Sequence, residues 1–344
     1  MPGTDAHSPK DTDFIDLSAE LGREPLLIQV SGGNTSVKED GLLWVKASGK
    51  ELSRANDEPI FVPLDLDGVR AAIDRDETDP ATPHVVGSTS LRPSIETTLH
   101  ALLPHRVVVH VHSVNALAWT TREDGEARIA EAMGGLNWVW VPYCRPGLPL
   151  TRMVQEVIGE DTDLLVLQNH GLVVGGDSAG EVDARLREAE GRLLVPPRPM
   201  PGPSAGLSAS ADQSGEYAPA SATIVHALGT DPDCFRKARG GALYPDHVVF
   251  LGPEAPIAER GRAWDEARDD YRARHGEPPQ YLIVEGAGVL LRRDCNFGVA
   301  EMLECQAEVL ARVGADVPLR YLTEVEVGEL LNWDAEAYRK TLNR

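Results

Sequence analysis

The chain of 344 residues is 42% hydrophobic and carries a formal net charge of −21, from 54 acidic and 33 basic side chains. This length and composition predict a globular protein of about two domains with a substantial buried core. So acidic a surface repels phosphate backbones and anionic membranes, which argues against nucleic-acid and membrane-surface binding. No apolar run approaches the roughly 20 residues needed to span a bilayer.

Cysteine usage and the N-terminal sequence indicate the compartment. The four cysteines include no C-x-x-C pair, which predicts reduced thiols rather than a disulfide framework. Residues 1–11 are polar and lack the apolar segment of a secretory signal. We therefore expect a cytoplasmic protein.

Two Gly/Ser turns stand out in the first fifty residues. Residues 13–23 are expected to form a helix, and residues 26–30 a strand that enters the turn Ser31-Gly-Gly-Asn-Thr-Ser36. Residues 37–47 suit a hairpin that ends at a second turn, Ser48-Gly-Lys50. Each turn alone is most simply a strand end. Two together could offer backbone N–H groups to one anion.

A helix is expected to start near Pro93 and to end near residue 103. Glu96 and His100 are four positions apart and hence on one helical face. The helix leads directly into the next strand, so Glu96 is expected at the same end of the fold as the histidines of that strand. The alternative is that Glu96 is only a first-turn carboxylate favoured by the helix dipole.

The run Val107-Val-Val-His-Val-His112 predicts a strand with two histidines on one face. A second apolar run, residues 163–171, ends in Asn-His170-Gly, and residues 172–174 are expected to continue that strand. Three histidine ligands with an open position are typical of catalytic zinc. A lone His-x-His pair is more often without a metal, but His170 and Glu96 together favour a metal site.

Further helices are expected at residues 69–74, 113–121, 150–158 and 178–194, and a strand at 137–141. The last helix opens with the capping box Ser178-Ala-Gly-Glu181. Residues 196–222, rich in Pro, Ser, Ala and Gly, predict a flexible linker. We therefore place a first domain at 13–195 and a second lobe at 223–344.

The sequence pattern of the second lobe repeats that of the first domain. Residues 245–251, interpreted as a strand, match 104–110, and residues 281–291 match 164–174. A helix follows the second match, here at 298–313. In this alignment Leu251, Pro253 and Ala287 stand at the positions of the three histidines. The second lobe is therefore expected to be a degenerate duplicate without metal ligands.

Five motifs resemble, in order and spacing, those of the class II aldolase/adducin family: Gly33-Asn-Thr-Ser36, Ser48-Gly49, Ser94-x-Glu96, His110-x-His112 and Asn169-His-Gly171. The stretch from Arg92 to His100 looks most like the aldolase part of rhamnulose-phosphate aldolase/alcohol dehydrogenase proteins. The resemblance covers roughly residues 13–195. It implies an α/β fold, an αβα three-layer sandwich with a mainly antiparallel central sheet, with the second lobe as a smaller α/β unit.

The same resemblance implies a site and an assembly. The metal would be held by His110, His112 and His170, with Zn2+ as the first choice and Mn2+, Fe2+ or Co2+ as alternatives. Glu96 would be the catalytic acid/base. A phosphate would be contacted by Gly33, Asn34, Ser48, Gly49 and Ser94. A tyrosine often assists as proton donor in such aldolases, and Tyr143 is the candidate. We expect a homo-oligomer, tetramer or dimer, that acts on a small-molecule sugar phosphate.

This set of residues suits retro-aldol cleavage of a ketose phosphate, because a divalent metal can polarise the carbonyl while a carboxylate moves the proton. A sugar-phosphate 4-epimerase is one alternative, and a non-catalytic adducin-like scaffold is another. The intact histidines argue against the scaffold. Ile95 replaces a second hydroxyl residue, and Arg92 is the one candidate for a basic phosphate clamp, which leaves open a differently phosphorylated or unphosphorylated substrate.

Overall fold

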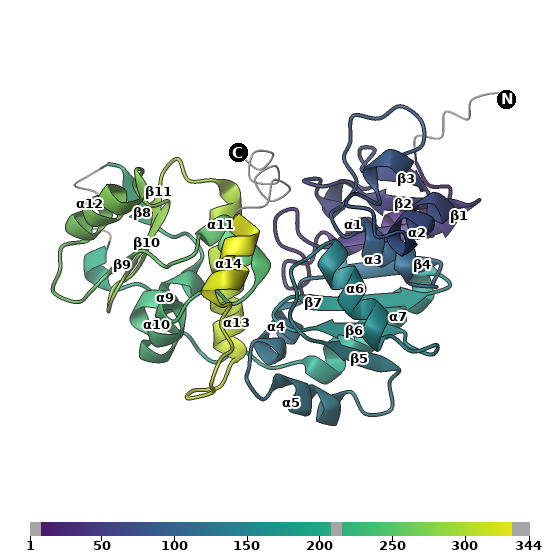
Figure 1. The fold of residues 1–344 in the computed structure, drawn as a ribbon. Helices are drawn as coiled ribbons and strands as arrows, with labels where there is room; N and C mark the ends of the chain where they lie inside the picture. The colour runs from purple at the N-terminus through teal and green to yellow at the C-terminus, as the bar shows by residue number, and fades with distance from the viewer. Residues whose placement is uncertain (1–7, 208–214, 332–344) are drawn as a thin grey trace. The chain divides into compact units, whose positions relative to one another are not determined.

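The computed structural model describes residues 8–207 and 215–331 (Figure 1). The chain divides into two compact units. The first comprises Met1–Thr120 and Gly125–Leu194, and the second Thr121–Asp124 and Val195–Arg344. Among the helices in the described ranges, none combines the length and apolar character needed to cross a membrane.

Within the described residues, the first unit contains a seven-stranded sheet with the strand order β3-β2-β1-β4-β7-β6-β5. All neighbouring strands are antiparallel except β5 and β6, which are parallel. The strands are β1 (Asn34–Glu39), β2 (Leu42–Lys46), β3 (Phe61–Asp65), β4 (Val107–Val111), β5 (Trp138–Val141), β6 (Leu164–Leu167) and β7 (Gly171–Gly176).

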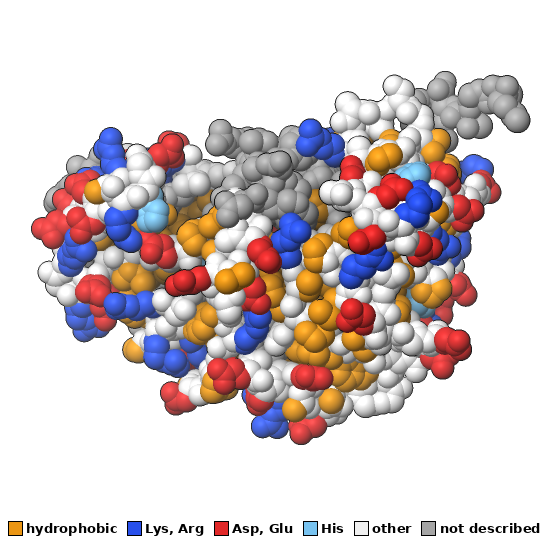
Figure 2. Space-filling model, viewed as in Figure 1, with side chains coloured by type: hydrophobic (Ala, Val, Ile, Leu, Met, Phe, Trp, Pro, Cys, Tyr) orange, Lys and Arg blue, Asp and Glu red, His pale blue; other side chains and the backbone are white. Residues whose placement is uncertain are grey.

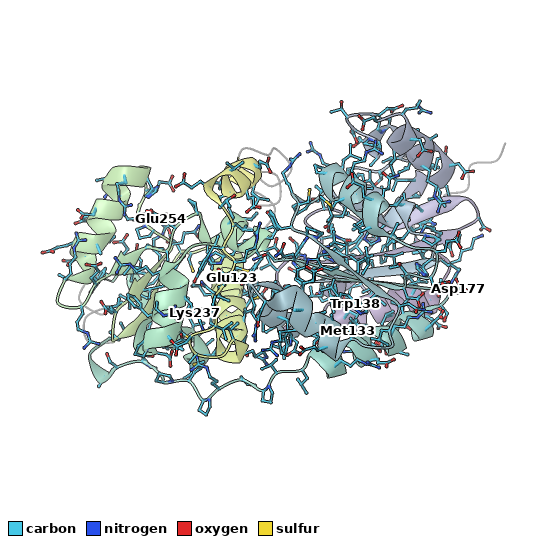
Figure 3. The ribbon with its side chains drawn as sticks, turned by 60° about the horizontal axis from the view of Figure 1, so that its bottom comes forward. Glu123, Met133, Trp138, Asp177, Lys237 and Glu254 are labelled. Atoms are coloured by element: carbon cyan, nitrogen blue, oxygen red, sulfur yellow. The ribbon has the colours of Figure 1, made fainter. Side chains whose placement is uncertain are left out.

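Helices cover both faces of this sheet (Figure 1). One face packs against α1 (Thr12–Leu21), α4 (Val114–Thr120), α5 (Gly125–Ala132) and α7 (Ala179–Leu193). The other packs against α2 (Leu66–Asp74), α3 (Thr97–Leu102) and α6 (Leu148–Val157). Val107 and Val109 face the first set and Val108 the second, as the alternation of a strand requires. Met133 and Trp138, labelled in Figure 3, belong to the first of these cores. The predicted αβα sandwich is confirmed.

The second unit contains a smaller sheet of four described strands in the order β8-β11-β10-β9. Its strands are β8 (Tyr217–Pro219), β9 (Ile257–Ala258), β10 (Tyr281–Val284) and β11 (Gly288–Arg292). Its helices are η3 (Thr223–His226), α9 (Ala227–Thr230), α10 (Pro232–Arg239), α11 (Pro245–Leu251), α12 (Trp264–His275), α13 (Phe297–Arg312) and α14 (Glu324–Leu331). Lys237 of α10, labelled in Figure 3, is buried, and its Nζ lies 2.7 Å from both Asp233 Oδ2 and Gly314 O.

Two predicted strands are wrong. Residues 26–30 form turns, because the N–H groups of Leu27 and Ile28 both donate to Glu24 O and fold the backbone back on itself. Residues 245–251 form helix α11 rather than a strand. Pro245 occupies the first turn of α11, where its missing N–H costs no hydrogen bond. This position favours a helix, although the β-branched residues Val248 and Val249 that follow would suit a strand.

A third prediction fails at the β6–β7 junction. The chain does not run on past Gly171 but reverses, so that β6 and β7 are antiparallel neighbours. Asn169 adopts a φ of +54° in this turn. A Cβ on Gly171 would lie 2.1 Å from Val111 O, so the turn can approach β4 only with glycine at that position. The edge strand β3 was not predicted.

The predicted linker differs in part from the structure. Tyr217–Pro219, inside residues 196–222, forms β8, and Tyr217 is buried with its hydroxyl donating to Pro279 O at 2.6 Å. Residues 208–214 of that linker, and residues 332–344 of the predicted second lobe, lie outside the described residues.

Candidate active site

Three histidine side chains converge where β4 ends and β6 turns into β7. His110 lies on β4, and His112 follows two positions later on the same face. His170 lies in the β6–β7 turn. One ring nitrogen from each histidine lies within 4.8 Å of the other two, and all three side chains are buried. The structure thus brings the three predicted ligands together.

A backbone contact orients the His110 ring. His110 Nδ1 lies 2.9 Å from Leu172 O and must donate to it, since a carbonyl oxygen only accepts. In the neutral ring, Nε2 of His110 therefore carries the lone pair, and it lies 3.1 Å from Nε2 of His112. Converging Nε2 lone pairs, with the far nitrogen anchored on a carbonyl, are the usual donor arrangement for a divalent metal. The residues present therefore fit such an ion.

Glu96 lies directly beside this cluster. Its Oε2 is 3.4 Å from His110 Nε2, and its Oε1 is 3.6 Å from His170 Nε2. Its side chain makes no capping hydrogen bond to α3, which speaks against a purely helix-capping role. Burial raises the pKa of Glu96, but His110 and His170, whenever these rings are protonated, and the hydrogen bond from Asn34 outweigh burial and lower the pKa to about 2.

The two carboxylate oxygens of Glu96 differ in their surroundings. Oε2 accepts a 2.8 Å hydrogen bond from Asn34 Nδ2. Oε1 is also buried, and it accepts no hydrogen bond from the part of the chain that the structure describes. One oxygen is therefore held in place, while the other is directed toward His170 and can accept a proton.

Gly33 and Asn34 connect the first Gly/Ser turn to the histidine strand. Asn34 pairs with His110 in the β1–β4 register. Gly33 has a φ of +59°, and a Cβ on it would lie 2.7 Å from His110 O. Only glycine allows both the conformation and the close approach. The side chain of Asn34 bonds to Glu96, so its role is wider than the predicted contact with a phosphate.

The second turn lies next to the segment that carries Ser94. Ser48 N donates to Arg92 O at 2.9 Å, and Gly49 has a φ of +74°. Ser94 Oγ accepts a 3.2 Å hydrogen bond from Glu96 N. The predicted residues of the second turn and Ser94 are therefore adjacent, and Ser94 helps to fix the start of α3.

Lys46 links the two turns and is buried, whereas a lysine beside these turns was expected to be solvated. Its buried Nζ donates to Ser31 O and to Lys50 O, both at 2.7 Å. A single ammonium group thus holds the first turn against the second. Its position at the end of β2, immediately before the second turn, was the signal available.

His100 and Ser36 were also missed as site residues. Ser36 Oγ lies 2.7 Å from His100 Nδ1, and His100 Nε2 bonds to Asn34 Oδ1. The signals were present: Asn34 and Ser36 share a face of β1, and His100 is four positions after Glu96.

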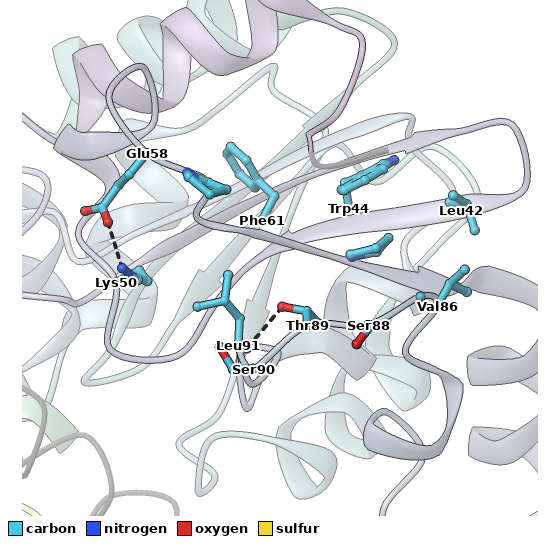
Figure 4. Close-up of a pocket in the computed structure, with 13 residues that line it drawn as sticks. Leu42, Trp44, Lys50, Glu58, Phe61, Val86, Ser88, Thr89, Ser90 and Leu91 are labelled. Carbon is cyan, nitrogen blue, oxygen red and sulfur yellow. Dashed lines mark hydrogen bonds and ion pairs between the residues drawn. The ribbon is translucent and has the colours of Figure 1, made fainter. Parts of the chain in front are cut away.

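Lys50, the last residue of the second turn, pairs with Glu58 at 2.8 Å (Figure 4). Both residues line a groove of about 470 Å³ with Trp44 and Phe61 of β2 and β3, and none of the predicted site residues lines it.

The backbone N–H of Tyr143 donates to Gln168 Oε1, two positions before His170. Its role as proton donor remains a prediction.

Comparison with known proteins now places the chain. Residues 13–192 match the Class II Aldolase and Adducin N-terminal domain. The chain belongs to the class II aldolase/adducin family. Over 192 residues it is 33% identical to the uncharacterized oxidoreductase YuxG of Bacillus subtilis, a match that covers 51% of this chain and 28% of that protein. The chain therefore spans about a quarter of the length of that relative.

Two other relatives match this chain over most of their own length. Methylthioribulose-1-phosphate dehydratase of Geobacillus kaustophilus is 29% identical over 202 residues, 52% of this chain and 86% of that protein. L-fuculose phosphate aldolase of Methanococcus vannielii is 28% identical over 155 residues, which cover 44% of this chain and 76% of that protein. Among solved structures, the N-terminal class II aldolase domain of a Thermoplasma acidophilum protein is 28% identical, with a TM-score of 0.48, over 56% of this chain and 94% of that one.

Proposed function

We propose that the first unit is a metal-dependent lyase that cleaves a ketose phosphate, or a related ketose or sugar acid, by a retro-aldol reaction. The observation that carries the proposal is the pairing of a buried three-histidine cluster with a carboxylate whose Oε1 accepts no hydrogen bond from the described chain. This combination places a proton acceptor, Glu96 Oε1, 3.6 Å from one of the three ring nitrogens that could hold a cation, His170 Nε2.

The protein residues have separate tasks in this reaction. His110, His112 and His170 would hold a divalent ion, with zinc as the first choice, which would act as a Lewis acid toward the substrate carbonyl. Glu96 Oε1 takes the proton from the hydroxyl of the carbon that leaves as aldehyde. The carbon–carbon bond breaks, its electron pair moves toward the carbonyl as an enediolate, and Glu96 returns the proton to carbon.

The phosphate is assigned to the two Gly/Ser turns. Gly33 and Gly49 have positive φ values, and backbone N–H groups in turns of this kind can bind anions without a cationic side chain. In the second turn the N–H groups of Ser48 and Lys50 already donate to Arg92 O and Ala47 O, so we assign the phosphate contact there to Gly49. On the face drawn in Figure 2, acidic and basic side chains are interspersed rather than segregated. Binding by backbone N–H groups explains how a chain with a net charge of −21 could hold an anionic substrate.

Dehydration is the second candidate reaction, and the match to methylthioribulose-1-phosphate dehydratase over 86% of that protein favours it. It could use the same residues. Glu96 would remove a proton from the carbon next to the carbonyl and deliver it to the hydroxyl group of the following carbon, which then leaves as water. The 4-epimerase, which repeats the retro-aldol step after rotation of the aldehyde, remains the third candidate.

A product analysis separates these reactions. The metal-loaded protein is incubated with a panel of ketose 1-phosphates that includes 5-methylthioribulose 1-phosphate, and products are identified by mass and NMR. A retro-aldolase yields dihydroxyacetone phosphate and an aldehyde. A dehydratase yields a product lighter by one water, and an epimerase yields an isomer. Absence of all three products across the panel would contradict the proposal.

The proposal extends to assembly and compartment. We place the protein in the cytoplasm as a homo-oligomer, dimer or tetramer, whose neighbouring subunit helps to complete the site. The four cysteines are free thiols, which suits a reducing compartment.

A further inference from the structure

A chain of buried hydrogen bonds runs from β1 through α3 to Glu96. Ser36 Oγ contacts His100 Nδ1 at 2.7 Å. His100 Nε2 contacts Asn34 Oδ1, and Asn34 Nδ2 donates to Glu96 Oε2 at 2.8 Å. All four side chains are buried.

The chemistry of these groups fixes the direction of each bond. Asn34 presents its oxygen to His100, so His100 Nε2 must donate and carry the proton. Burial lowers the pKa of His100 to about 3, so the ring is neutral and Nδ1 carries a lone pair. Ser36 Oγ–H therefore donates to Nδ1. With its oxygen engaged in this way, the Asn34 amide can present only its NH2 group to Glu96.

We propose that His100 is a positioning residue that holds the Asn34 amide in one orientation and thereby holds Oε2 of Glu96. This leaves Oε1 as the proton-accepting atom. The inference rests on the proposed function of Glu96 and adds a residue that does not touch the substrate. If the Asn34 amide turned over, its oxygen would face Oε2 and repel the carboxylate from its place beside the histidines.

The test combines NMR with kinetics. In protein with 15N-labelled histidine, the resonance of His100, assigned by its loss in His100→Gln, reports which nitrogen carries the proton. The variants His100→Leu, which removes the donor, and His100→Gln, whose amide can replace it, are then compared for kcat, KM and metal content. Thr35→Val is the matched control for Ser36→Ala, because Thr35 is buried on the opposite face of β1 and bonds to Ser18.

We expect a neutral His100 with its proton on Nε2 at pH 7. His100→Leu should lower kcat about 10–100-fold with little change in KM or metal content, and His100→Gln should recover most of the loss. Ser36→Ala should lower kcat more than Thr35→Val. A proton on Nδ1 in the folded protein would overturn the proposal even if no substrate is turned over, which separates its failure from that of the proposed function. Equal losses in His100→Leu and His100→Gln would also overturn it.

A second inference comes from the two sheets. In the first unit, β5-β6-β7-β4 are joined by one parallel and then two antiparallel pairings. In the second unit, β9-β10-β11-β8 show the same order and the same directions. Each set also appears in the same order along the chain, and a long helix follows its last strand, α7 or α13.

The registers agree residue by residue. Leu164 pairs with Val174, and their counterparts 117 positions later, Tyr281 and Leu291, also pair. The N–H of Gln168 donates to Val141 O, and 117 positions later the same bond joins Glu285 to Ala258. In the next turn Asn169 and Gly286 both have positive φ, +54° and +76°.

The first strand of the second set, β8, follows its counterpart β4 by fewer than 117 positions. In the first unit His110 pairs with Val173, and in the second unit Pro219 pairs with Leu290. Leu290 lies 117 positions after Val173, but Pro219 lies only 109 positions after His110. The eight residues of difference fall before β9, where the seven-residue helix α11 stands. The sequence alignment that matched residues 245–251 to 104–110 was therefore wrong in that segment.

We infer that β8 to α13 is a second copy of β4 to α7 with α11 inserted. The metal-ligand positions of the copy are Pro219, Ser221 and Ala287. The side chains of Pro219 and Ala287 are half-buried and that of Ser221 is exposed, so the copy has space at these positions but no imidazoles.

Restoring the histidines tests this inference. The variant Pro219→His/Ser221→His/Ala287→His, made in a His110→Ala/His112→Ala/His170→Ala background, should bind Co2+ with a shifted visible spectrum. The control replaces Pro219→His by Ala218→His, which points to the other face of the sheet. If the triple variant does not fold, as judged by circular dichroism, Ser221→His/Ala287→His alone is compared with Ala218→His/Ala287→His. Folded variants that bind Co2+ no better than their controls would overturn the inference.

Discussion

Asn34 and Glu96 are 62 positions apart in the sequence, and the side-chain amide of Asn34 donates a 2.8 Å hydrogen bond to Glu96 Oε2. Asn34 also lies opposite His110 across the β1–β4 pair. The carboxylate and the strand that carries His110 are therefore held by the same residue of β1. This arrangement leaves Oε1 of Glu96 for the proton transfer that we propose.

Glu96→Gln keeps the shape of the side chain and removes its basicity. We expect kcat to fall about 10²–10⁴-fold, the usual contribution of a general acid or base. The metal content should not change, because the three histidines remain. Turnover of the substrate found in the product screen is compared with that of Glu181→Gln, which changes a carboxylate in the first turn of α7 that accepts a hydrogen bond from Asp177 N. Equal turnover in the two variants would mean that Glu96 is not the acid/base.

Gly33→Ala should destabilise the protein more than Gly41→Ala. Both glycines have positive φ, +59° and +79°, so both variants pay the cost of a left-handed alanine. The new methyl group at residue 33 also meets Ile28 Cδ1 at 2.4 Å and His110 O at 2.7 Å, whereas that at residue 41 meets nothing within 4 Å. Overpacking of this kind costs about 1–3 kcal/mol. Urea unfolding of both variants gives the difference, and equal free energies would refute the crowding argument.

Lys38 should give the stability a characteristic dependence on pH. Its Nζ donates to Leu103 O and His105 O, in the turn between α3 and β4, and burial lowers its pKa to about 7. The unfolded chain, with a pKa near 10.5, binds the proton more tightly between these values. Stability therefore rises with pH in this window, by up to about 1.4 kcal/mol per pH unit.

Replacement of this lysine tests the slope directly. Lys38→Met should flatten the pH dependence of the free energy of unfolding between pH 7 and 10.5. Below pH 7, where Lys38 is charged in both states, the curves of variant and wild type should run parallel. An unchanged slope above pH 7 would show that Lys38 is not the group responsible.

The parts of the site that are local in sequence could be predicted. Alternation along β4 places His110 and His112 on one face, and the short connection from α3 to β4 brings Glu96 near them. The αβα architecture followed from the resemblance of five motifs to a known family. These predictions needed only short-range geometry and motif order.

The parts that depend on distant contacts could not be predicted. The turn at Asn169 reverses the chain because Gly171 must approach Val111 O, a contact with another strand. The strand β8 exists because Tyr217–Pro219 pair with β11, although their local composition suits a linker. The hydrogen bonds of Asn34 link three elements, and a residue pattern does not show which way a side-chain amide turns.

The metal content of the purified protein tests the central claim most directly. Elemental analysis after dialysis against metal-free buffer should give one divalent ion per chain in the wild type, and close to none when His110, His112 or His170 is replaced by alanine. The control variant is His105→Ala. His105 lies just before β4 and pairs with Asp163, so its replacement should leave the metal content unchanged. A wild-type chain that retains no divalent ion after loading, or alanine variants that retain the full amount, would contradict the account.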